Sequence, residues 1–311
     1  MPTHRPNPVS HRSDVVSHNP VSRKGVTAFL IISFAGTWLW LLFARTALDL
    51  SPLNPLLQLP GFCMPGIAAV AVRRWITNEG FADAGLGLRL KAARRYYAVA
   101  LLGPPLLAAA TLALAAVSGL WHPDLSGPGG IPGVKELATV LGLMAVALIL
   151  TPVYAGEEFG WTSYLRPRLF GGRTTPSIIA TGLIWAVWHF PLAFIGYVEF
   201  SNVVIGLAVW TLVFQLQEII LMWLYVRSGS VWVASLAHAG NNMVLFLVLG
   251  AVLDDRAGLG SITPMLLSLV PMAAICLWIT GSRRLTGEHR IPEPALTPGE
   301  PGRRHAELDP E

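Results

Sequence analysis

The sequence predicts an all-α membrane protein, a polytopic bundle of about eight transmembrane helices. The chain has 311 residues, of which 53% are hydrophobic and only 13% are charged. Soluble proteins carry about 25% charged residues. The apolar residues also gather in long runs, close to the roughly 20 residues that a helix needs to cross a bilayer. These observations exclude a soluble enzyme, a disordered chain and a secreted disulfide scaffold.

Eight apolar runs qualify as transmembrane helices. The second is short and contains Pro60 and Pro65, each followed by glycine, so we expect a broken helix there. The third contains Pro104 and Pro105 near its start, where we expect a kink. In chain order the predicted spans are 26–48, 56–72, 96–120, 137–155, 177–197, 203–226, 231–253 and 262–281.

The two ends of the chain differ from the apolar bundle, which is predicted over 25–281. Segments 1–24 and 282–311 are rich in proline and charge and have no apolar run, which predicts disordered tails. A cleaved signal peptide is not expected, because the first span is too long and lacks a clear small-residue cleavage site.

The distribution of basic residues predicts the orientation in the membrane. With a cytoplasmic N-terminus, nineteen of the 22 Lys and Arg residues lie on the cytoplasmic side, and only Arg45, Lys135 and Arg256 lie on the other. Basic loops stay in the cytoplasm, so both termini are predicted to be cytoplasmic, with the protein in the cell membrane. The net charge of +4 then reflects topology and anionic lipid, and no nucleic-acid partner is expected.

Few ionisable side chains fall inside the predicted spans, where each is costly and marks a candidate functional site. Among 18 acidic residues, only Glu157, Glu158 and Glu218 lie within spans or at their ends. Among eight histidines, only His189 and His238 do so. These five residues are therefore the first candidates for chemistry.

Helix geometry predicts that several of these groups meet at one depth. At 1.5 Å per residue, Glu157, His189 and His238 each lie about 13–20 Å from the cytoplasmic end of their helix. Asn242 follows His238 at i+4 and so shares its helix face. A carboxylate pair, two imidazoles and a carboxamide at one level indicate a catalytic site that is reached from the cytoplasmic side.

The residue types suit water activation. A carboxylate beside an imidazole can hold and deprotonate a water molecule, and a second imidazole and a carboxamide can donate to a developing oxyanion. The same groups could instead bind a divalent metal such as zinc, although the His-Glu-x-x-His pattern of zinc proteases is absent. Neither Cys63 nor Cys276 lies beside a histidine, and Gly-x-Ser-x-Gly and Walker loops are also absent, which disfavours nucleophilic and phosphate chemistry.

Each side chain taken alone also fits a structural role. A buried histidine is often only hydrogen-bonded, and the glutamate pair could form an interfacial ion pair with Arg166 and Arg168. Asn242 could join two helices. Glu218 and Gln217 are more typical of a polar patch facing the bundle interior than of a substrate or proton contact.

Three motifs, taken together, are specific. Glu157-Glu-Phe-Gly-Trp-Thr-Ser-Tyr-Leu165 begins with a glutamate pair, Trp185 stands four residues before His189, and His238-x-x-x-Asn242 follows. In order and spacing they resemble the CAAX prenyl protease type 2 and bacteriocin-processing family of intramembrane proteases, also called the abortive-infection family. The resemblance covers about 137–253.

The resemblance implies an endopeptidase that hydrolyses a peptide bond of a membrane-associated or prenylated peptide. By that resemblance Glu157 activates water with the help of His189, and Glu158 has a supporting role. His238 and Asn242 would stabilise the oxyanion. The family is often described as metalloproteases, but the motifs leave the metal requirement open.

One position departs from the family pattern. Thr162 stands where the family motif has an arginine that is thought to brace the second glutamate. Arg166, one helical turn later, is the expected substitute. If Glu158 were left without compensation, the chain would be a non-catalytic immunity or scaffold protein of the same family. A transporter is the third class, but two related halves with broken helices are not visible in the sequence.

Overall fold

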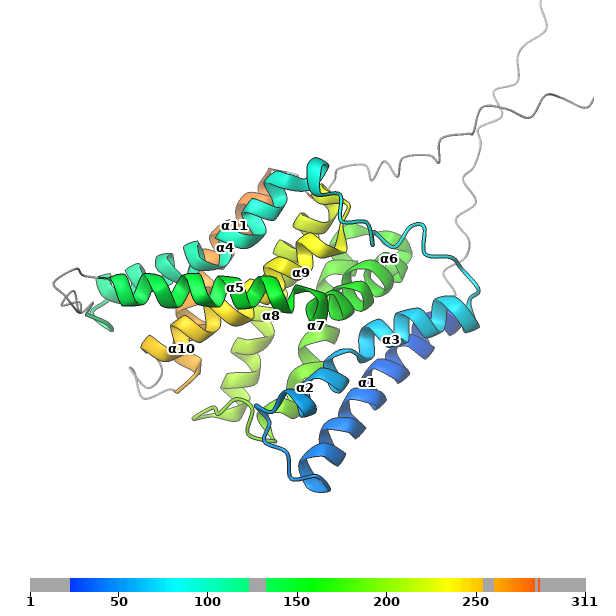
Figure 1. Cartoon of the computed structure of the whole chain (residues 1–311), viewed down its shortest axis with the longest axis horizontal. Coiled ribbons are helices and arrows are strands. Elements are labelled where there is room, and N and C mark those ends of the chain that lie inside the picture. The colour runs from blue at the N-terminus through cyan, green and yellow to red at the C-terminus, as the bar shows by residue number, and fades with distance from the viewer. Residues whose placement is uncertain (1–22, 123–132, 254–259, 283–284, 286–311) are drawn as a thin grey trace, which may run out of the picture.

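The computed structural model is an all-α bundle (Figure 1), and it describes residues 23–122, 133–253, 260–282 and 285. Within these residues there is no β-strand, only an isolated bridge between Phe200 and Gly260. Eight helical segments are long and apolar enough to cross a membrane. The predicted fold class and the predicted number of spans are confirmed.

The helices follow one another in the predicted order. They are α1 (Arg23–Thr46), α2 (Pro55–Phe62), α3 (Met64–Ala71), α4 (Leu90–Val117), α5 (Val134–Glu158), α6 (Arg166–Arg168), α7 (Thr174–His189), α8 (Val203–Ser228), α9 (Val231–Gly240), α10 (Leu247–Leu253) and α11 (Ile262–Gly281). Three π-helical turns among the described residues, η1 (Val72–Ile76), η3 (Phe159–Leu165) and η6 (Asn241–Phe246), continue α3, α5 and α9. A 3₁₀ turn, η5 (Phe190–Ala193), follows α7.

The second span is broken at Cys63, which ends α2 and precedes α3. Pro65 has no N–H and cannot donate to the carbonyl of Gly61. The hydroxyl of Thr37 on α1 donates to that carbonyl instead, at 2.8 Å. The predicted break is therefore present, and a neighbouring helix satisfies the backbone group that it leaves open.

The third span begins earlier than predicted, at Leu90 instead of residue 96, and runs as one helix through Pro104 and Pro105. A methyl group on Gly240 of α9 would lie only 2.6 Å from the ring of Pro104. The glycine therefore gives the ring the space it needs against α9. Tertiary packing, which the sequence does not reveal, keeps this proline pair inside a helix.

The fourth and fifth spans end at places other than the predicted ones. The fourth continues through η3 and α6 to Arg168 instead of ending at residue 155, so the glutamate pair lies inside it. The glutamate side chains form hydrogen bonds within the bundle, and a hydropathy profile does not reveal such bonds. The fifth α-helix ends at His189 instead of residue 197, because Pro191 follows and only a 3₁₀ turn continues.

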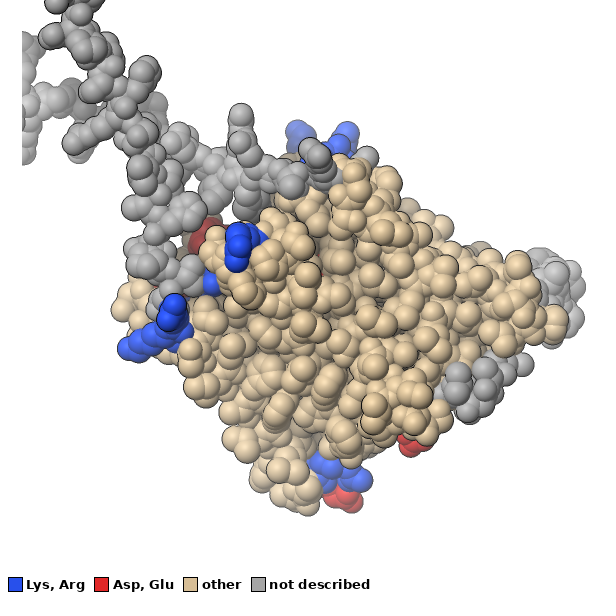
Figure 2. Space-filling model, turned by 180° about the vertical axis from the view of Figure 1, so that it is seen from behind, with Lys and Arg blue, Asp and Glu red and all other residues tan. Residues whose placement is uncertain are grey.

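The helix pair α9 and α5 forms the middle of the bundle. In Figure 1, α5 crosses the molecule in front of α9, and α1 lies beside α3 at one side. The face shown in Figure 2 is formed mostly by uncharged residues, with Lys and Arg gathered mainly toward one side. The protein is an integral membrane protein. The predicted tails lie outside the described residues, except for 23–24, which begin α1, and for 282 and 285.

Candidate active site

The indole of Trp185 lies at the centre of the polar groups. Its Nε1 donates to Oε2 of Glu157 at 3.1 Å, which joins α7 to α5. Its ring lies 5.0 Å from the ring of His238 on α9 and 5.7 Å from the ring of His189, measured between centroids. Three helices thus bring Glu157, His189 and His238 around one side chain.

Glu158 and His238 form a buried pair. Nδ1 of His238 lies 2.9 Å from Oε1 of Glu158, and the hydroxyl of Thr162 donates to Oε2 at 2.6 Å. Both carboxylate oxygens are therefore engaged, and Glu158 is not left without partners as the missing arginine suggested. Thr162, one helical turn after Glu158, supplies the second bond.

The hydrogen bonds of the two histidines determine which ring nitrogen is available. A carboxylate and a carbonyl can only accept, so Nδ1 carries a proton in both rings. For His238 the acceptor is Glu158, and for His189 it is the backbone carbonyl of Trp185, at 2.9 Å. Nε2 of each ring is left for other partners. This arrangement is typical of imidazoles that are oriented by a second group.

Asn242 lies in the π-helical turn that follows α9, and its Nδ2 donates to the hydroxyl of Tyr154 at 3.2 Å. The ring of Tyr154 contacts that of His238, with centroids 4.6 Å apart. Tyr154 precedes Glu157 by one helical turn, so it belongs to the same group of side chains. The sequence analysis missed it, although its i,i+3 spacing from Glu157 could have indicated it.

An aromatic wall encloses the site. The ring of His189 stacks on Phe214 at 4.3 Å and meets Trp188 at 4.7 Å and Trp210 at 5.7 Å. Glu157, Glu158, His189 and His238 are only 3%, 1%, 8% and 2% exposed. The polar groups therefore interact with one another in a largely dry environment, where electrostatic interactions are strong.

Glycines let α3 approach the backbone that carries the glutamates. A Cβ on Gly160 would lie 2.7 Å from the backbone carbon of Pro65, and one on Gly66 would lie 2.8 Å from the carbonyl oxygen of Gly156. Gly156 and Gly160 are four residues apart, the small-xxx-small spacing of close helix contacts in membranes. This contact with α3 fixes the position of the backbone that carries the glutamate pair. The sequence analysis missed it, although the spacing of the glycines is visible in the sequence.

Arg166 does not pair with Glu158 as expected. Within the described part of the chain, no ion pair of Arg166 lies within 4.0 Å, and its strongest electrostatic interaction is with Glu218, ahead of that with Glu158. Arg166 and Glu218 are 7% and 1% exposed, and Arg166 Nε and Glu218 Oε1 have no hydrogen-bond partner among the described residues. Glu218 thus lies in the bundle interior next to the site and contributes no hydrogen bond to it.

The described side chains do not form a metal centre. Among them, no group of three His, Cys, Asp or Glu residues is placed to hold a metal ion. Both oxygens of Glu158 and Nδ1 of both histidines already have partners. The ring atoms left for a further ligand are Nε2 of His189 and of His238, and neither belongs to a three-ligand set among the described side chains.

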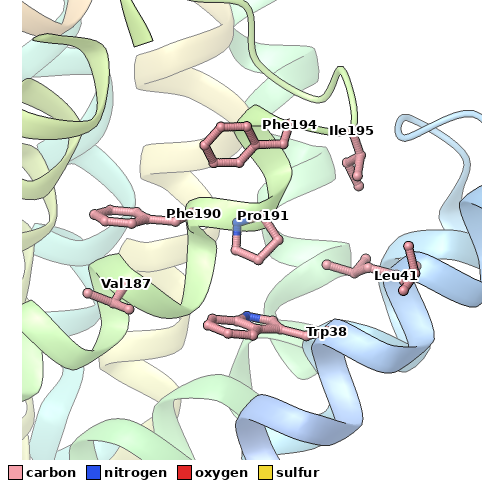
Figure 3. Close-up of a pocket in the computed structure, with 8 residues that line it drawn as sticks. Trp38, Leu41, Val187, Phe190, Pro191, Phe194 and Ile195 are labelled. Carbon is pink, nitrogen blue, oxygen red and sulfur yellow. The ribbon is translucent and has the colours of Figure 1, made fainter. Parts of the chain in front are cut away.

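Two apolar cavities flank the site, and neither is lined by its carboxylates or imidazoles. One, of about 420 Å³, lies between Trp38 and Leu41 of α1 and Phe190, Pro191 and Phe194 after α7 (Figure 3). Its lining residues Val187 and Phe190 lie on either side of His189 in the chain.

The other cavity has about 400 Å³ and lies between α3 and the glutamate helix. Cys63, Gly66, Gly156 and Phe159 line it together with three further apolar residues. Gly156 and Phe159 directly flank the glutamate pair in the chain. Both cavities are lined almost entirely by apolar groups.

The arrangement is that of an integral membrane protein with a buried Glu–His site. Residues 137–244 match the family model of type II CAAX prenyl endopeptidases, described as Rce1-like. This match, over part of the chain, supports the resemblance to CAAX proteases that the three motifs indicated, and all five predicted site residues lie within it. It points to a peptidase. No curated protein sequence matches the chain.

Proposed function

We propose that the protein is an intramembrane endopeptidase in which Glu157 activates the attacking water. The observation that carries the proposal is the convergence of Glu157, His189 and His238 on Trp185. Trp185 donates to Oε2 of Glu157, and the indole of Trp161 interacts with the same carboxylate. A carboxylate has about four acceptor positions, so Glu157 can still accept a proton from water.

In the proposed reaction, water binds between Glu157 and Nε2 of His189. Glu157 takes a proton as the water oxygen attacks the peptide carbonyl carbon. The carbonyl oxygen becomes an oxyanion, stabilised by Nε2–H of a protonated His238 and by Asn242. Collapse of the tetrahedral intermediate breaks the C–N bond, and Glu157 returns its proton to the leaving amine. Glu158 holds His238 and stabilises its charged form.

The proposed substrate is a membrane-associated or prenylated peptide. Two apolar cavities beside a buried polar site favour a substrate whose cleaved bond lies next to an apolar anchor. A soluble peptide without an apolar anchor would gain little binding free energy from these cavities. The alternative is a non-catalytic immunity or scaffold member of the family, which would use the same surfaces only to bind partners.

We further propose that the site is reached from the cytoplasm, with both chain ends on that side of the cell membrane. The loops that carry most of the described basic residues contact one another. Arg168 pairs with Glu79 at 2.8 Å, and the hydroxyl of Ser230 donates to the carbonyl of Gly87 at 2.7 Å. Three loops predicted to be cytoplasmic thus lie together, which supports the charge-based orientation.

The test is cleavage of a labelled peptide library by the purified full-length protein in lipid, comparing prenylated with unprenylated peptides. Glu157→Gln should reduce hydrolysis by at least about 100-fold, because the amide can still accept from Trp185 but cannot take a proton. Its melting temperature should stay close to that of the wild type. Glu199→Gln, at an exposed loop position, is the matched control and should remain active.

Wild-type turnover in Glu157→Gln would overturn the assignment of the base. No cleavage of any peptide by a folded wild-type protein would favour the scaffold alternative. An equal loss of folding and activity would mean that Glu157 has a structural role.

A further inference from the structure

The hydroxyl of Tyr154 has a proton to give. Its oxygen accepts from Nδ2 of Asn242 at 3.2 Å, and the part of the chain that the structure describes holds no acceptor for its own O–H. A phenol is both a donor and an acceptor. A partly buried phenol whose acceptor role is filled by a fixed amide is therefore a donor that a further group can use.

The position of Tyr154 matches the place where negative charge would develop. Its ring lies 4.6 Å from that of His238, and it interacts electrostatically with Glu157. It thus lies between the proposed base on its own helix and the proposed oxyanion donors on α9 and η6. Neither the glutamate nor the histidine motifs include this residue.

We propose that Tyr154 is a further catalytic residue, which donates its hydroxyl hydrogen bond to the oxyanion of the tetrahedral intermediate. The proposal rests on the proposed peptidase function. Asn242 then has two tasks: one N–H orients the phenol oxygen, and the other stays free for the oxyanion. The phenol keeps its proton throughout, so no bond to hydrogen is broken and the reaction balances as before.

A second phenol lies nearby and must be distinguished. Tyr197, in the loop after η5, interacts electrostatically with Tyr154 and Glu157. Burial and the carboxylate of Glu157 raise the pKa of Tyr197. It is therefore a protonated donor as well. Asn242, however, holds only Tyr154 by a hydrogen bond, and a fixed donor is the one that stabilises charge without reorganisation.

The experiment measures kcat and KM of the full-length protein on a peptide that the wild type cleaves. Tyr154→Phe should lower kcat by about 100-fold, the usual effect of removing one oxyanion donor, with KM changed less than about threefold. Tyr164→Phe is the matched control, because its hydroxyl is buried without a partner in the helical turn after Glu158. This control should keep wild-type kcat. Asn242→Asp keeps the shape but captures the phenol proton, and should lower kcat as well.

The outcomes separate the two proposals. If the folded wild type cleaves no peptide, the proposed function fails, and the role of Tyr154 fails with it. If the wild type cleaves and Tyr154→Phe keeps its kcat, only the role of Tyr154 is overturned. The role of Tyr154 would also be overturned if Tyr154→Phe raised KM without lowering kcat. The same holds if Tyr197→Phe lowered kcat and Tyr154→Phe did not. Should Tyr154→Phe fail to fold, normal kcat in a folded Asn242→Asp variant would overturn the proposal.

Discussion

The hydroxyl of Thr162 donates a 2.6 Å hydrogen bond to Glu158, four residues earlier in the chain. In the family motif this position is an arginine. A hydroxyl satisfies the oxygen of Glu158 without neutralising its charge, so the carboxylate keeps its full attraction for the imidazole of His238. In the proposed reaction, in which His238 donates to the oxyanion, this attraction favours the charged imidazole that such a donor needs.

Thr162→Val removes this hydroxyl and keeps the shape of the side chain. Glu158 would be left with an unsatisfied buried oxygen, which should lower the free energy of unfolding by about 1–3 kcal/mol. A less firmly held His238 should also lower turnover. Thermal melting and peptide cleavage measure both effects. Thr181→Val is the matched control, because the Thr181 hydroxyl is buried without a partner. Equal melting temperatures of the two variants would contradict the bracing role.

Thr162→Arg should not restore the family pattern in this chain. Thr162 is fully buried, and Arg166 already lies one turn away. A larger cation would overpack the turn, at a cost of about 1–3 kcal/mol, and would repel the guanidinium of Arg166. We expect a lower melting temperature and lower activity than in the wild type. A variant that is more active and at least as stable would show that Glu158 lacks positive charge.

Arg166 and Glu218 should behave as one buried charge pair. Each is almost fully buried, and each is the strongest electrostatic partner of the other. Arg166→Met or Glu218→Leu alone leaves a buried charge without its partner, which should cost roughly 3 kcal/mol. The double variant should melt closer to the wild type than either single variant. Additive losses in the double variant would show that the two side chains do not interact.

The eight spans and the three motifs could be predicted because hydropathy and short spacing are properties of the chain itself. The end of the fourth span could not. Its glutamates are stabilised by Trp185 and His238, which lie 28 and 80 residues away in the chain. A hydropathy profile places the end of a transmembrane helix before such charged residues. The partner of Arg166 was also predicted wrongly, because spacing on one helix favours Glu158, whereas Glu218 comes from another helix.

The glycine contact behind the glutamates predicts a large effect of a small change. Gly160→Ala would place a methyl group 2.6–2.8 Å from Pro65, including its backbone, so α3 would have to move. We expect a loss of about 1–3 kcal/mol in stability together with loss of activity, because the glutamate pair would shift. Gly142→Ala on the same helix meets nothing within 4 Å and is the control. If both alanine variants melt like the wild type, α3 does not define the position of the pair.

Metal removal should leave hydrolysis unchanged, because the proposed water activation uses only Glu157 and His189. The experiment compares turnover before and after dialysis against a chelator, with metal content measured in both samples. Loss of activity that returns on adding zinc would show that the site recruits a metal. The free Nε2 atoms of His189 and His238 would then be its first candidate ligands.

Acid should destabilise the loop beside the site through Asp83. Its oxygens lie 2.8 and 3.3 Å from the guanidinium of the fully buried Arg73, which also donates to the carbonyl of Gly80. Partial burial raises the pKa of Asp83, but the hydrogen bonds and charge of Arg73 outweigh this and hold the pKa below its ordinary value. A carboxyl group whose pKa is lower in the folded state than in the unfolded state, where it is about 3.9, stabilises the fold at any pH above the unfolded-state pKa. This stabilisation is lost as the pH falls through the folded-state pKa.

Asp83→Asn should therefore have a lower melting temperature than the wild type at neutral pH. Its free energy of unfolding should fall by only roughly 1 kcal/mol, because the side chain of Asp83 is 54% exposed. The difference should shrink as the pH falls below about 4, since the wild type then loses the same charge. Asp49→Asn is the control, because Asp49 pairs with Arg45 at 2.8 Å while 94% exposed. Exposed pairs of this kind contribute little, so its melting curve should follow the wild type at every pH. A gap between Asp83→Asn and the wild type that stays constant from pH 7 to pH 3 would mean that the Arg73–Asp83 charge interaction does not stabilise the loop.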